Sequence, residues 1–320
     1  MKRIQLNKRT DLKSEIPLKT PYCIFIDPSS ACNFKCGFCM NKNIKSPSIM
    51  SMSLFKKLID DLEEFESPVK TIRLYGFGEP LLNPNFCEMV KYAKASKKVL
   101  EVDTTTNASR LSTELIKELI DSGIDRINIS IEAMNTENYQ KFTNNKNITF
   151  KEICFNVKNL FEAKKENQII FAKIAGDYLT DEEKKTFNDI FSLITDGCDI
   201  EHTMNCWRDV KVENVNQNVG IYGQELKEVT TCPYVFYSFF IHADGDASAC
   251  FLDWNKKLVI GDAKNESLKS LWEDKTFWNL RKIMLNKERK NHPVCYDCNQ
   301  LVAGMPVDLD DHAENILGKL

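Results

Sequence analysis

The segment Cys32-Asn33-Phe34-Lys35-Cys36-Gly37-Phe38-Cys39 places three thiols within eight positions, directly after a short apolar run. A tetrahedral zinc site needs a fourth ligand, which this segment does not supply. A four-iron cluster held by three thiolates instead leaves one iron open to bind another molecule. The spacing therefore predicts a metal-binding loop, either a cluster with one open iron or a zinc site completed by a ligand from elsewhere.

On both sides of this loop, short β-branched runs alternate with longer amphipathic ones as far as about Cys206. The predicted strands are Tyr22–Asp27, Thr71–Tyr75, Val99–Thr104, Arg126–Ile131, Ile169–Ile174 and Asp199–Met204. The predicted helices are Ser53–Phe65, Asn85–Ala95, Ser112–Ser122, Phe150–Lys165 and Asp181–Thr195. This alternation predicts an α/β fold with a parallel sheet, either open or curled into a partial barrel. Functional sites in such folds lie at the carboxyl ends of the strands.

The composition excludes several classes of protein. With 320 residues, 42% apolar and 28% charged, the chain can bury a core and is not disordered. The net charge is −3 and the 43 basic and 46 acidic residues are mixed, so we expect no nucleic-acid surface. The longest apolar run, near Val235–Ile241, is too short to span a bilayer, so we expect a cytoplasmic protein without a membrane segment. In a reducing cytosol, twelve cysteines are more often metal ligands and buried thiols than disulfides.

Beyond Trp207 the chain becomes polar, which predicts a linker or a substrate loop. Val235–His242 and Ala247–Leu252 flank an Asp-Gly-Asp turn and predict a β-hairpin, which two short helical segments follow. Four further cysteines accompany these elements: Cys232, Cys250, Cys295 and Cys298. Four thiolates can fully ligate one cluster or one zinc ion, and their spacing alone does not separate the two.

Three more segments follow the cysteine loop, one on each of the next predicted strands. They are Gly76-Phe77-Gly78-Glu79-Pro80, Thr104-Thr105-Thr106-Asn107 and Ile127-Asn128-Ile129-Ser130-Ile131-Glu132. Together with the cysteine loop they resemble the radical S-adenosylmethionine superfamily over about residues 22–204. Phe77 stands where that family commonly has glycine, and Glu132 where aspartate is commoner. The resemblance implies a partial (βα)6 TIM-like barrel.

The resemblance also implies roles for individual residues. Cys32, Cys36 and Cys39 would hold a [4Fe–4S] cluster whose open iron chelates S-adenosylmethionine. The other residues expected to contact this cofactor are Phe38 on the adenine, Gly76, Gly78 and Glu79 at the methionyl end, and Asn107 and Ser130 on the following strands. A turn or capping role is the alternative for Asn107 and Ser130.

The cofactor-binding arginine that many relatives carry after the fourth strand is absent here, where the chain has Tyr139–Thr143. Lys141 or Lys173 could take its place, and Lys173, which interrupts an apolar strand, is expected to point into a polar site. Cys206 lies just past the sixth predicted strand and is a candidate hydrogen-atom donor. Further candidate substrate contacts are Trp207, Arg208 and Tyr222.

The second cysteine group resembles the Twitch region, the half-SPASM extension of that family with one auxiliary [4Fe–4S] cluster. Its spacing resembles that of the BtrN-like aminocyclitol dehydrogenases. The implied division of the chain is an N-terminal extension (1–21), a radical SAM barrel (22–207), a linker or substrate loop (208–231) and a small hairpin-and-helix Twitch domain with a tail (232–320).

A radical SAM enzyme generates a 5′-deoxyadenosyl radical that abstracts a hydrogen atom from the substrate. An auxiliary cluster that accepts the remaining electron favours dehydrogenation. About thirty residues precede Cys32, fewer than a leader-peptide recognition domain needs, which favours a small carbohydrate- or cyclitol-like substrate. A flavodoxin- or ferredoxin-type protein is the expected electron donor. The alternatives are peptide modification, redox-neutral dehydration or epimerisation, and a zinc-binding scaffold without activity.

Overall fold

Nine strands form one continuous sheet in the order β6-β5-β4-β3-β2-β1-β7-β8-β9. The computed structural model describes residues 10–207, 209–210, 212, 215 and 218–320. The strands are β1 (Cys23–Ile26), β2 (Val69–Leu74), β3 (Val99–Thr106), β4 (Arg126–Ile131), β5 (Ile169–Ala175), β6 (Gly197–Glu201), β7 (Ser238–Ile241), β8 (Asp246–Ser248) and β9 (Val259–Asp262). Strands β1 to β7 pair in parallel, whereas β8 and β9 are antiparallel additions at the β7 edge.

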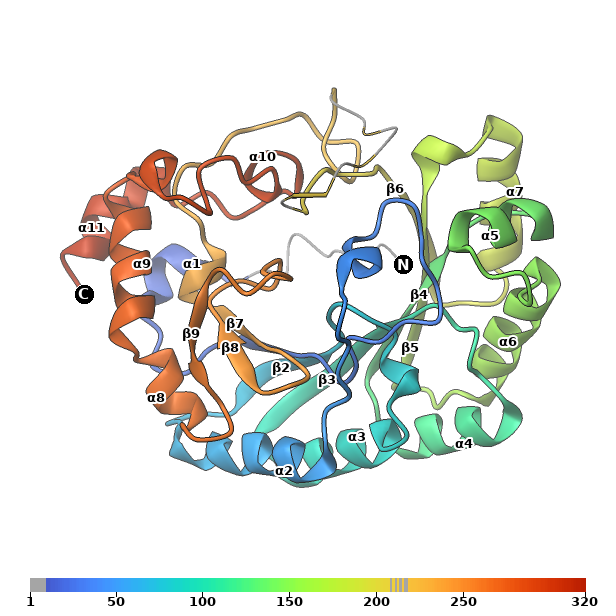
Figure 1. Ribbon diagram of the computed structural model, residues 1–320, viewed down its shortest axis with the longest axis horizontal. Helices are drawn as coiled ribbons and strands as arrows, with labels where there is room; N and C mark the ends of the chain where they lie inside the picture. The colour runs from blue at the N-terminus through green and yellow to red at the C-terminus, as the bar shows by residue number, and fades with distance from the viewer. Residues whose placement is uncertain (1–9, 208, 211, 213–214, 216–217) are drawn as a thin grey trace.

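Helices connect the parallel strands and follow the outer side of the curved sheet (Figure 1). The α-helices are α1 (Leu12–Glu15), α2 (Met52–Asp60), α3 (Phe86–Ala95), α4 (Thr113–Asp121), α5 (Thr136–Thr143), α6 (Phe150–Ala163), α7 (Asp181–Phe191), α8 (Leu268–Trp272), α9 (Lys275–Leu285), α10 (Gln300–Ala303) and α11 (Ala313–Leu317). None of these helices, within the part of the chain that the structure describes, combines the length and the apolar character that crossing a membrane requires.

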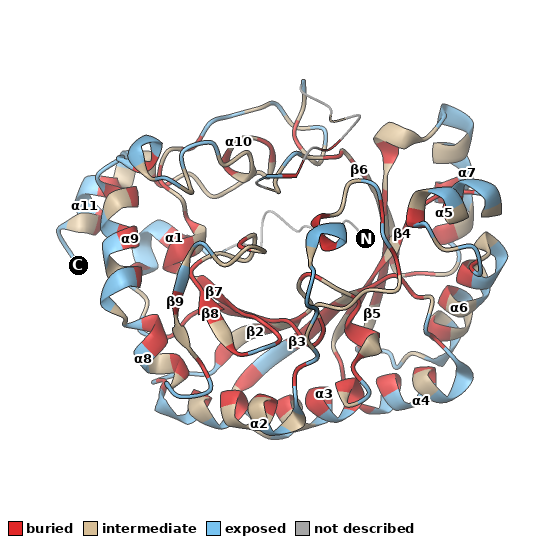
Figure 2. Cartoon of the chain, in the orientation of Figure 1, coloured by how far each residue is buried: buried red, intermediate tan, exposed pale blue. Residues whose placement is uncertain are grey.

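Local sequence explains where the connecting helices begin. Ser51 and Ser112 each accept a hydrogen bond from the backbone N–H three residues ahead, at the start of α2 and α4. Thr149 and Glu152 form a reciprocal capping box at the start of α6. The apolar faces of these helices pack on strands such as β1, which is buried at all four positions. Figure 2 shows the resulting contrast between buried strands and exposed outer helix surfaces.

The six parallel strands with helical crossovers confirm the predicted partial barrel with a small C-terminal hairpin region. The sequence did not predict that β7 pairs in parallel with β1, with Cys23 opposite Ser238 and Ile26 opposite Ile241. The C-terminal hairpin therefore extends the barrel sheet itself. As a consequence, side chains of β7 lie next to those of β1.

Candidate functional site

The cysteine loop lies between β1 and α2, at the carboxyl end of the parallel strands. Two of its thiols already accept backbone hydrogen bonds, since Phe34 N donates to Cys32 Sγ and Asn41 N to Cys39 Sγ, both at 3.4 Å. N–H groups aimed at sulfur are one of the protein's means of tuning an iron–sulfur cluster. The loop backbone thus presents these two sulfurs as acceptors before any metal is considered.

Burial opposes ionisation of the three thiols. It raises the pKa of Cys32 to about 12 and that of Cys36 well above its ordinary value. For Cys36, the carboxylate of Glu132 and the neighbouring thiols Cys39 and Cys32 raise the pKa further. Thiolates packed this closely need a strong positive charge among them, which bound iron supplies. The donor set therefore fits a cationic metal cluster.

The arrangement differs from that of a site for one ion. Among the described residues, no three His, Cys, Asp or Glu side chains are placed to hold a metal ion together. In a four-iron cluster each thiolate binds a different iron, so the ligands stand farther apart than those around a single ion. The described residues therefore contain no site for a single ion, and this finding does not exclude a cluster held by Cys32, Cys36 and Cys39.

Two glycines after β2 allow the cysteine loop to approach the sheet. A Cβ at Gly78 would lie 2.3 Å from the carbonyl oxygens of Ser29 and Ala31, and a Cβ at Gly76 would lie 2.7 Å from Cγ of Asp27. The next residue, Glu79, donates its backbone N–H to the Ala31 oxygen at 2.8 Å. Any larger residue at Gly78 would therefore push the cysteine loop away from the second strand.

Glu79 links the second strand to the third. Its buried carboxylate accepts bonds from Thr106 Oγ1 at 2.6 Å, Asn107 N at 2.8 Å and Leu81 N at 3.1 Å. Asn107 in turn donates from Nδ2 to Oδ1 of Asn33 in the cysteine loop at 3.0 Å. The structure thus brings Glu79 and Asn107 together beside the loop. Their contact with S-adenosylmethionine stays a prediction.

Phe38 and Ser130 lie on two other sides of the same region. Phe38 packs against Phe142 of α5 at 5.2 Å and against Tyr178 at 6.3 Å between ring centroids. Ser130 on β4 stands opposite Lys173 on β5 in the register of the sheet. An adenine contact for Phe38 and a cofactor contact for Ser130 stay predictions.

Lys173 belongs to a charged group at the mouth of the barrel. Its Nζ lies 3.7 Å from Oε2 of Glu201 on β6. Burial raises the pKa of Glu132 to about 7, and the charge of Lys173 opposes that rise. Lys173 therefore lies close enough to act on the same carboxylate that faces Cys36.

Cys206 lies near both cysteine groups. Burial raises the pKa of its thiol to about 12, the thiols of Cys298 and Cys39 add to the rise, and Lys173 lowers it. The neighbouring Trp207 packs edge-on against Phe77 at 6.2 Å. Of the other candidate substrate contacts, Tyr222 lies in the segment before β7, and Arg208 lies outside the described residues.

The second cysteine group comes together from three separate segments. Each of Cys232, Cys250 and Cys295 has its pKa raised by burial and, next, by the charge of another thiol of the group. Burial also raises the pKa of Cys298. Leu252 N donates to Cys250 Sγ at 3.4 Å, the same kind of bond as in the first loop. Four half-buried cysteines within electrostatic reach of one another fit the four ligands of one cluster.

Sequence reasoning missed Arg289, a buried arginine that holds this second group together. It donates to the carbonyl oxygens of Thr230, Cys295 and Tyr296 at 3.1, 2.9 and 3.2 Å, and to Oε1 of Glu228 at 3.1 Å. Three of these four partners are backbone oxygens, which leave no trace in the sequence. Only the burial of an arginine between cysteines could have revealed it.

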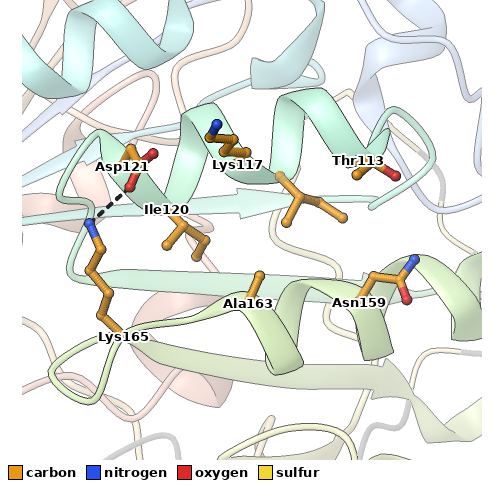
Figure 3. A pocket seen from close by; sticks show the side chains of 8 residues that line it. Thr113, Lys117, Ile120, Asp121, Asn159, Ala163 and Lys165 are labelled. Atoms are coloured by element: carbon orange, nitrogen blue, oxygen red, sulfur yellow. Dashed lines mark hydrogen bonds and ion pairs between the residues drawn. The ribbon is translucent and has the colours of Figure 1, made fainter.

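A groove on the outer layer, between α4 and α6, is separate from this chemistry (Figure 3). Its lining includes Ile120 and Ala163. Lys165 Nζ, also in the lining, donates to Asp121 Oδ1 at 3.0 Å. It contains none of the predicted site residues and lies on the helical side of the sheet.

The geometry above agrees with comparisons to known protein families. Residues 26–190 match the radical SAM superfamily. The chain belongs to that superfamily. Residues 232–299 match SPASM, an iron–sulfur cluster-binding domain. The cofactors of this radical SAM protein are therefore S-adenosylmethionine with its [4Fe–4S] cluster, and an auxiliary iron–sulfur cluster.

Curated relatives match only part of the chain. A cofactor-modifying protein for tungsten-containing aldehyde ferredoxin oxidoreductase from Pyrococcus furiosus is 32% identical over 114 residues, which are 35% of this chain and 31% of the relative. A GTP 3′,8-cyclase from Rippkaea orientalis is 35% identical over 123 residues, 36% of this chain and 35% of the relative. The matches thus span about a third of these proteins.

Two solved structures share the fold over most of this radical SAM chain. BtrN in complex with AdoMet and 2-DOIA has a TM-score of 0.55 at 18% identity, covering 87% of this chain and 92% of BtrN. SuiB from Streptococcus suis, bound to the precursor peptide SuiA, has a TM-score of 0.68 at 14% identity, covering 84% of this chain and 69% of SuiB. At these identities the likeness concerns the fold alone.

Proposed function

We propose that this radical SAM enzyme dehydrogenates a hydroxyl group of a small carbohydrate- or cyclitol-like molecule. The observation that carries the proposal is the gathering of four half-buried cysteines within electrostatic reach of one another: Cys232, Cys250, Cys295 and Cys298. Four thiolates can ligate every iron of a cluster, which leaves it no open iron for the substrate. A fully ligated cluster suits electron acceptance, as a two-electron oxidation requires.

In this proposal, different residues of the chain have different roles. Cys32, Cys36 and Cys39 would hold the first cluster, and Glu79 fixes the glycine segment against the third strand. Bound S-adenosylmethionine would supply the abstraction of a hydrogen atom from an unactivated C–H bond. Trp207, Phe77 and Phe240 form an apolar wall that would exclude water from the reacting carbon. Lys173, paired with Glu201, would offer a charged contact to a polar substrate or to the cofactor carboxylate.

A small-molecule substrate is supported by the likeness in fold to BtrN, whose structure holds 2-DOIA. Peptide modification is the second candidate, because the SuiB fold gives the higher TM-score, 0.68 against 0.55. We further propose a flavodoxin- or ferredoxin-type electron donor, since the first cluster must be reduced in every turnover.

The test uses the anaerobically reconstituted protein with S-adenosylmethionine, dithionite and a panel of myo-inositol, glucosamine and UDP-glucose. The expected results are 5′-deoxyadenosine in equal amount to a product two mass units lighter, and transfer of substrate deuterium into 5′-deoxyadenosine. Cleavage of the cofactor without any change in these polyols, together with modification of a synthetic peptide encoded near the gene, would replace the proposal with its alternative.

A further inference from the structure

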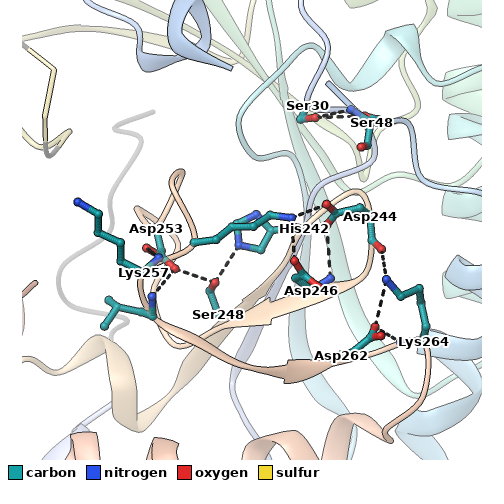
Figure 4. Close-up of polar contacts among 12 residues, drawn as sticks. Ser30, Ser48, His242, Asp244, Asp246, Ser248, Asp253, Lys257, Asp262 and Lys264 are labelled. Atoms are coloured by element: carbon teal, nitrogen blue, oxygen red, sulfur yellow. Dashed lines mark hydrogen bonds and ion pairs between the residues drawn. The ribbon is translucent and has the colours of Figure 1, made fainter. Parts of the chain in front are cut away.

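The hairpin that joins the barrel sheet carries a buried chain of three polar side chains. His242 Nε2 lies 2.8 Å from Ser248 Oγ, and Ser248 Oγ lies 2.8 Å from Asp253 Oδ2 (Figure 4). All three residues are buried, at 4%, 0% and 4% exposure. None of them belongs to the segments that resemble the radical SAM superfamily.

The partners of Asp253 fix the direction of both hydrogen bonds. Its carboxylate also accepts Lys257 N and Leu258 N, each at 2.8 Å. An ionised carboxylate can only accept, so the Ser248 hydroxyl donates its proton to Asp253. The Ser248 oxygen is then left to accept the N–H of His242 Nε2. A neutral imidazole that carries its proton on Nε2 has an unprotonated lone pair on Nδ1.

The position of His242 places that lone pair at the carboxyl end of the barrel. Asp27 and His242 directly follow the paired residues Ile26 of β1 and Ile241 of β7, and Asp27 N donates to the Ile241 oxygen at 2.9 Å. Side chains alternate along a strand, which puts His242 on the same face as Phe240. The His242 ring contacts Phe240 at 4.8 Å and Phe77, in the glycine segment after β2, at 5.5 Å between centroids.

A buried carboxyl with one unpaired oxygen lies on the same face, because Asp27 Oδ1 accepts Ser29 N at 3.3 Å but Oδ2 accepts nothing from the described residues. Asp27 is 1% exposed. The hydrogen bond of the His242 ring to Ser248 Oγ uses Nε2, which leaves Nδ1 for another partner. Buried polar atoms are normally paired, so the unpaired Oδ2 of Asp27, on the face that His242 shares, indicates a place for a polar group from outside the chain. A substrate hydroxyl is such a group.

We propose that Nδ1 of His242 accepts the hydroxyl proton of the substrate, and that Ser248 and Asp253 are positioning residues that hold the imidazole in the required tautomer. This proposal rests on the proposed dehydrogenation. The substrate loses the hydrogen atom of its C–H bond to the adenosyl group of S-adenosylmethionine and its O–H proton to His242. It loses one further electron to the auxiliary iron–sulfur cluster, and its C–O bond becomes C=O.

The surroundings keep His242 neutral until it receives that proton. Burial lowers its pKa to about 4, the charge of Lys256 lowers it further, and Asp244 and Asp246 on the hairpin oppose this. The Asp27 carboxyl, directly after β1, lies on the same side of the sheet by the alternation of side chains. Once protonated, the imidazolium would be stabilised through Ser248 by the carboxylate of Asp253, as in other Asp-supported histidine bases.

The first arm of the test measures the tautomer directly. The chain has four histidines, so the ¹⁵N spectrum of histidine-labelled holoprotein is simple, and the signal lost in His242→Gln assigns the residue. We expect a protonated Nε2 and an unprotonated Nδ1, and a mixture of tautomers in Ser248→Ala. A protonated Nδ1 in the parent protein would overturn the proposal, whatever the substrate is.

The second arm measures product. His242→Gln places an amide where Nε2 lies and keeps the bond to Ser248, but removes the basic lone pair. We expect product from the substrate identified in the panel to fall about 100- to 10,000-fold, the range of a general base. Deuterium transfer from the substrate C–D bond into 5′-deoxyadenosine should persist, because hydrogen abstraction precedes proton loss. Ser248→Ala should lose about tenfold, since it keeps the imidazole.

Controls separate this proposal from the proposed function and from a folding defect. His312→Gln, near the end of the chain, should match the parent protein in product, iron content and melting temperature. Full product formation by His242→Gln would refute the base while leaving dehydrogenation intact. No product from the parent protein with any polyol would instead refute the proposed function, and the tautomer arm would still decide whether His242 offers its lone pair.

Discussion

The two cysteine sites of this protein are built in opposite ways. The first is local: Cys32, Cys36 and Cys39 come from one loop, which Gly78 and Glu79 fix against the sheet. The second collects cysteines from positions 232 to 298, and one buried arginine ties their backbone together. The cysteines of both sites can be named from the sequence, whereas the arginine that supports the second site is seen only in the structure.

The two sites also differ in the charges that face them. Glu132 and Glu79 act on thiols of the first group, and both raise the pKa values there. Arg289 acts on the second group and lowers the pKa values of Cys232, Cys295 and Cys298. Nearby charge is one determinant of cluster potential, and a cation stabilises a cluster that gains an electron. The Arg289 cation at the second site is compatible with the electron-accepting role that the proposed dehydrogenation gives it.

Loss of a ligand at the first site is expected to have the largest effect. Cys36→Ala removes one of three ligands, so reductive cleavage of S-adenosylmethionine should fall to background, measured as 5′-deoxyadenosine release. Cys87→Ala removes a buried thiol from α3, outside both sites, and should keep cleavage. Cleavage at the parent rate by Cys36→Ala would mean that this loop does not hold the cofactor.

The same change at the second site should separate cleavage from product. We expect Cys295→Ala to keep uncoupled cleavage of S-adenosylmethionine, because the first loop is intact, but to form no product. The measurement is the ratio of product to 5′-deoxyadenosine, with Cys154→Ala, a half-buried thiol of α6, as the control. An unchanged ratio in Cys295→Ala would make the second group structural and remove the contrast between the sites.

Gly78→Ala tests how the first site depends on its fit to the sheet. Its Cβ would lie 2.3 Å from two backbone oxygens of the cysteine loop, so the loop must move. We expect cleavage to fall about 10- to 100-fold, since a displacement of about 1 Å can cost that much. Gly37→Ala in the same loop has nothing within 4 Å and should match the parent protein. Equal rates in the two variants would contradict the close approach.

The sequence predicted the positions of the strands better than the helix α5 or the pairing of β7 with β1. It placed the first six strands because buried parallel strands are continuous apolar runs, but it placed the sixth two residues late, among charged residues. It missed α5, Thr136–Thr143, because only Tyr139 and Thr143 are buried and the helix has almost no apolar face. The pairing of β7 with β1 joins segments more than 200 residues apart, and no local pattern encodes it.

Side chains that form hydrogen bonds with backbone groups could not be predicted from the sequence either. Arg289 bonds mainly to carbonyl oxygens, and Ser248 and Asp253 are residue types that turns commonly contain. The cysteines were found because their spacing is itself the signal. The groups that orient the cysteines were not found, because orientation is a property of the folded chain.

Arg289→Met should weaken the second site without touching the first. It removes four hydrogen bonds and leaves buried carbonyls unsatisfied, which we expect to lower the free energy of unfolding by about 3 kcal/mol. Lys290→Met is the matched control: it bonds the same Glu228 from an exposed position and should cost less than about 1 kcal/mol. The measurements are melting temperature and iron content, and an equal loss in both variants would show that Arg289 has no special part.

The smallest effect is expected at the junction of β1 and β7, where Asp27 and His242 change the stability of the protein with pH in opposite directions. The pKa of His242 is lowered from 6.5 to about 4, so the unfolded chain binds a proton that the native protein does not, and stability falls as pH drops from 6.5 to 4. The pKa of Asp27 is raised from 3.8 to about 7 by burial, so its contribution to stability falls as pH rises through that window.

Variants of these neighbours should therefore change the pH dependence of stability in opposite directions. His242→Gln should lose less stability than the parent protein between pH 6.5 and 4, by roughly 3 kcal/mol at most. Asp27→Asn should gain relative to the parent protein between pH 4 and 7, by a similar amount, because a neutral amide has no charge to desolvate. Melting temperatures across this pH range measure both. Parallel shifts in the two variants would mean that the junction of β1 and β7 does not keep a neutral imidazole beside a neutral carboxyl.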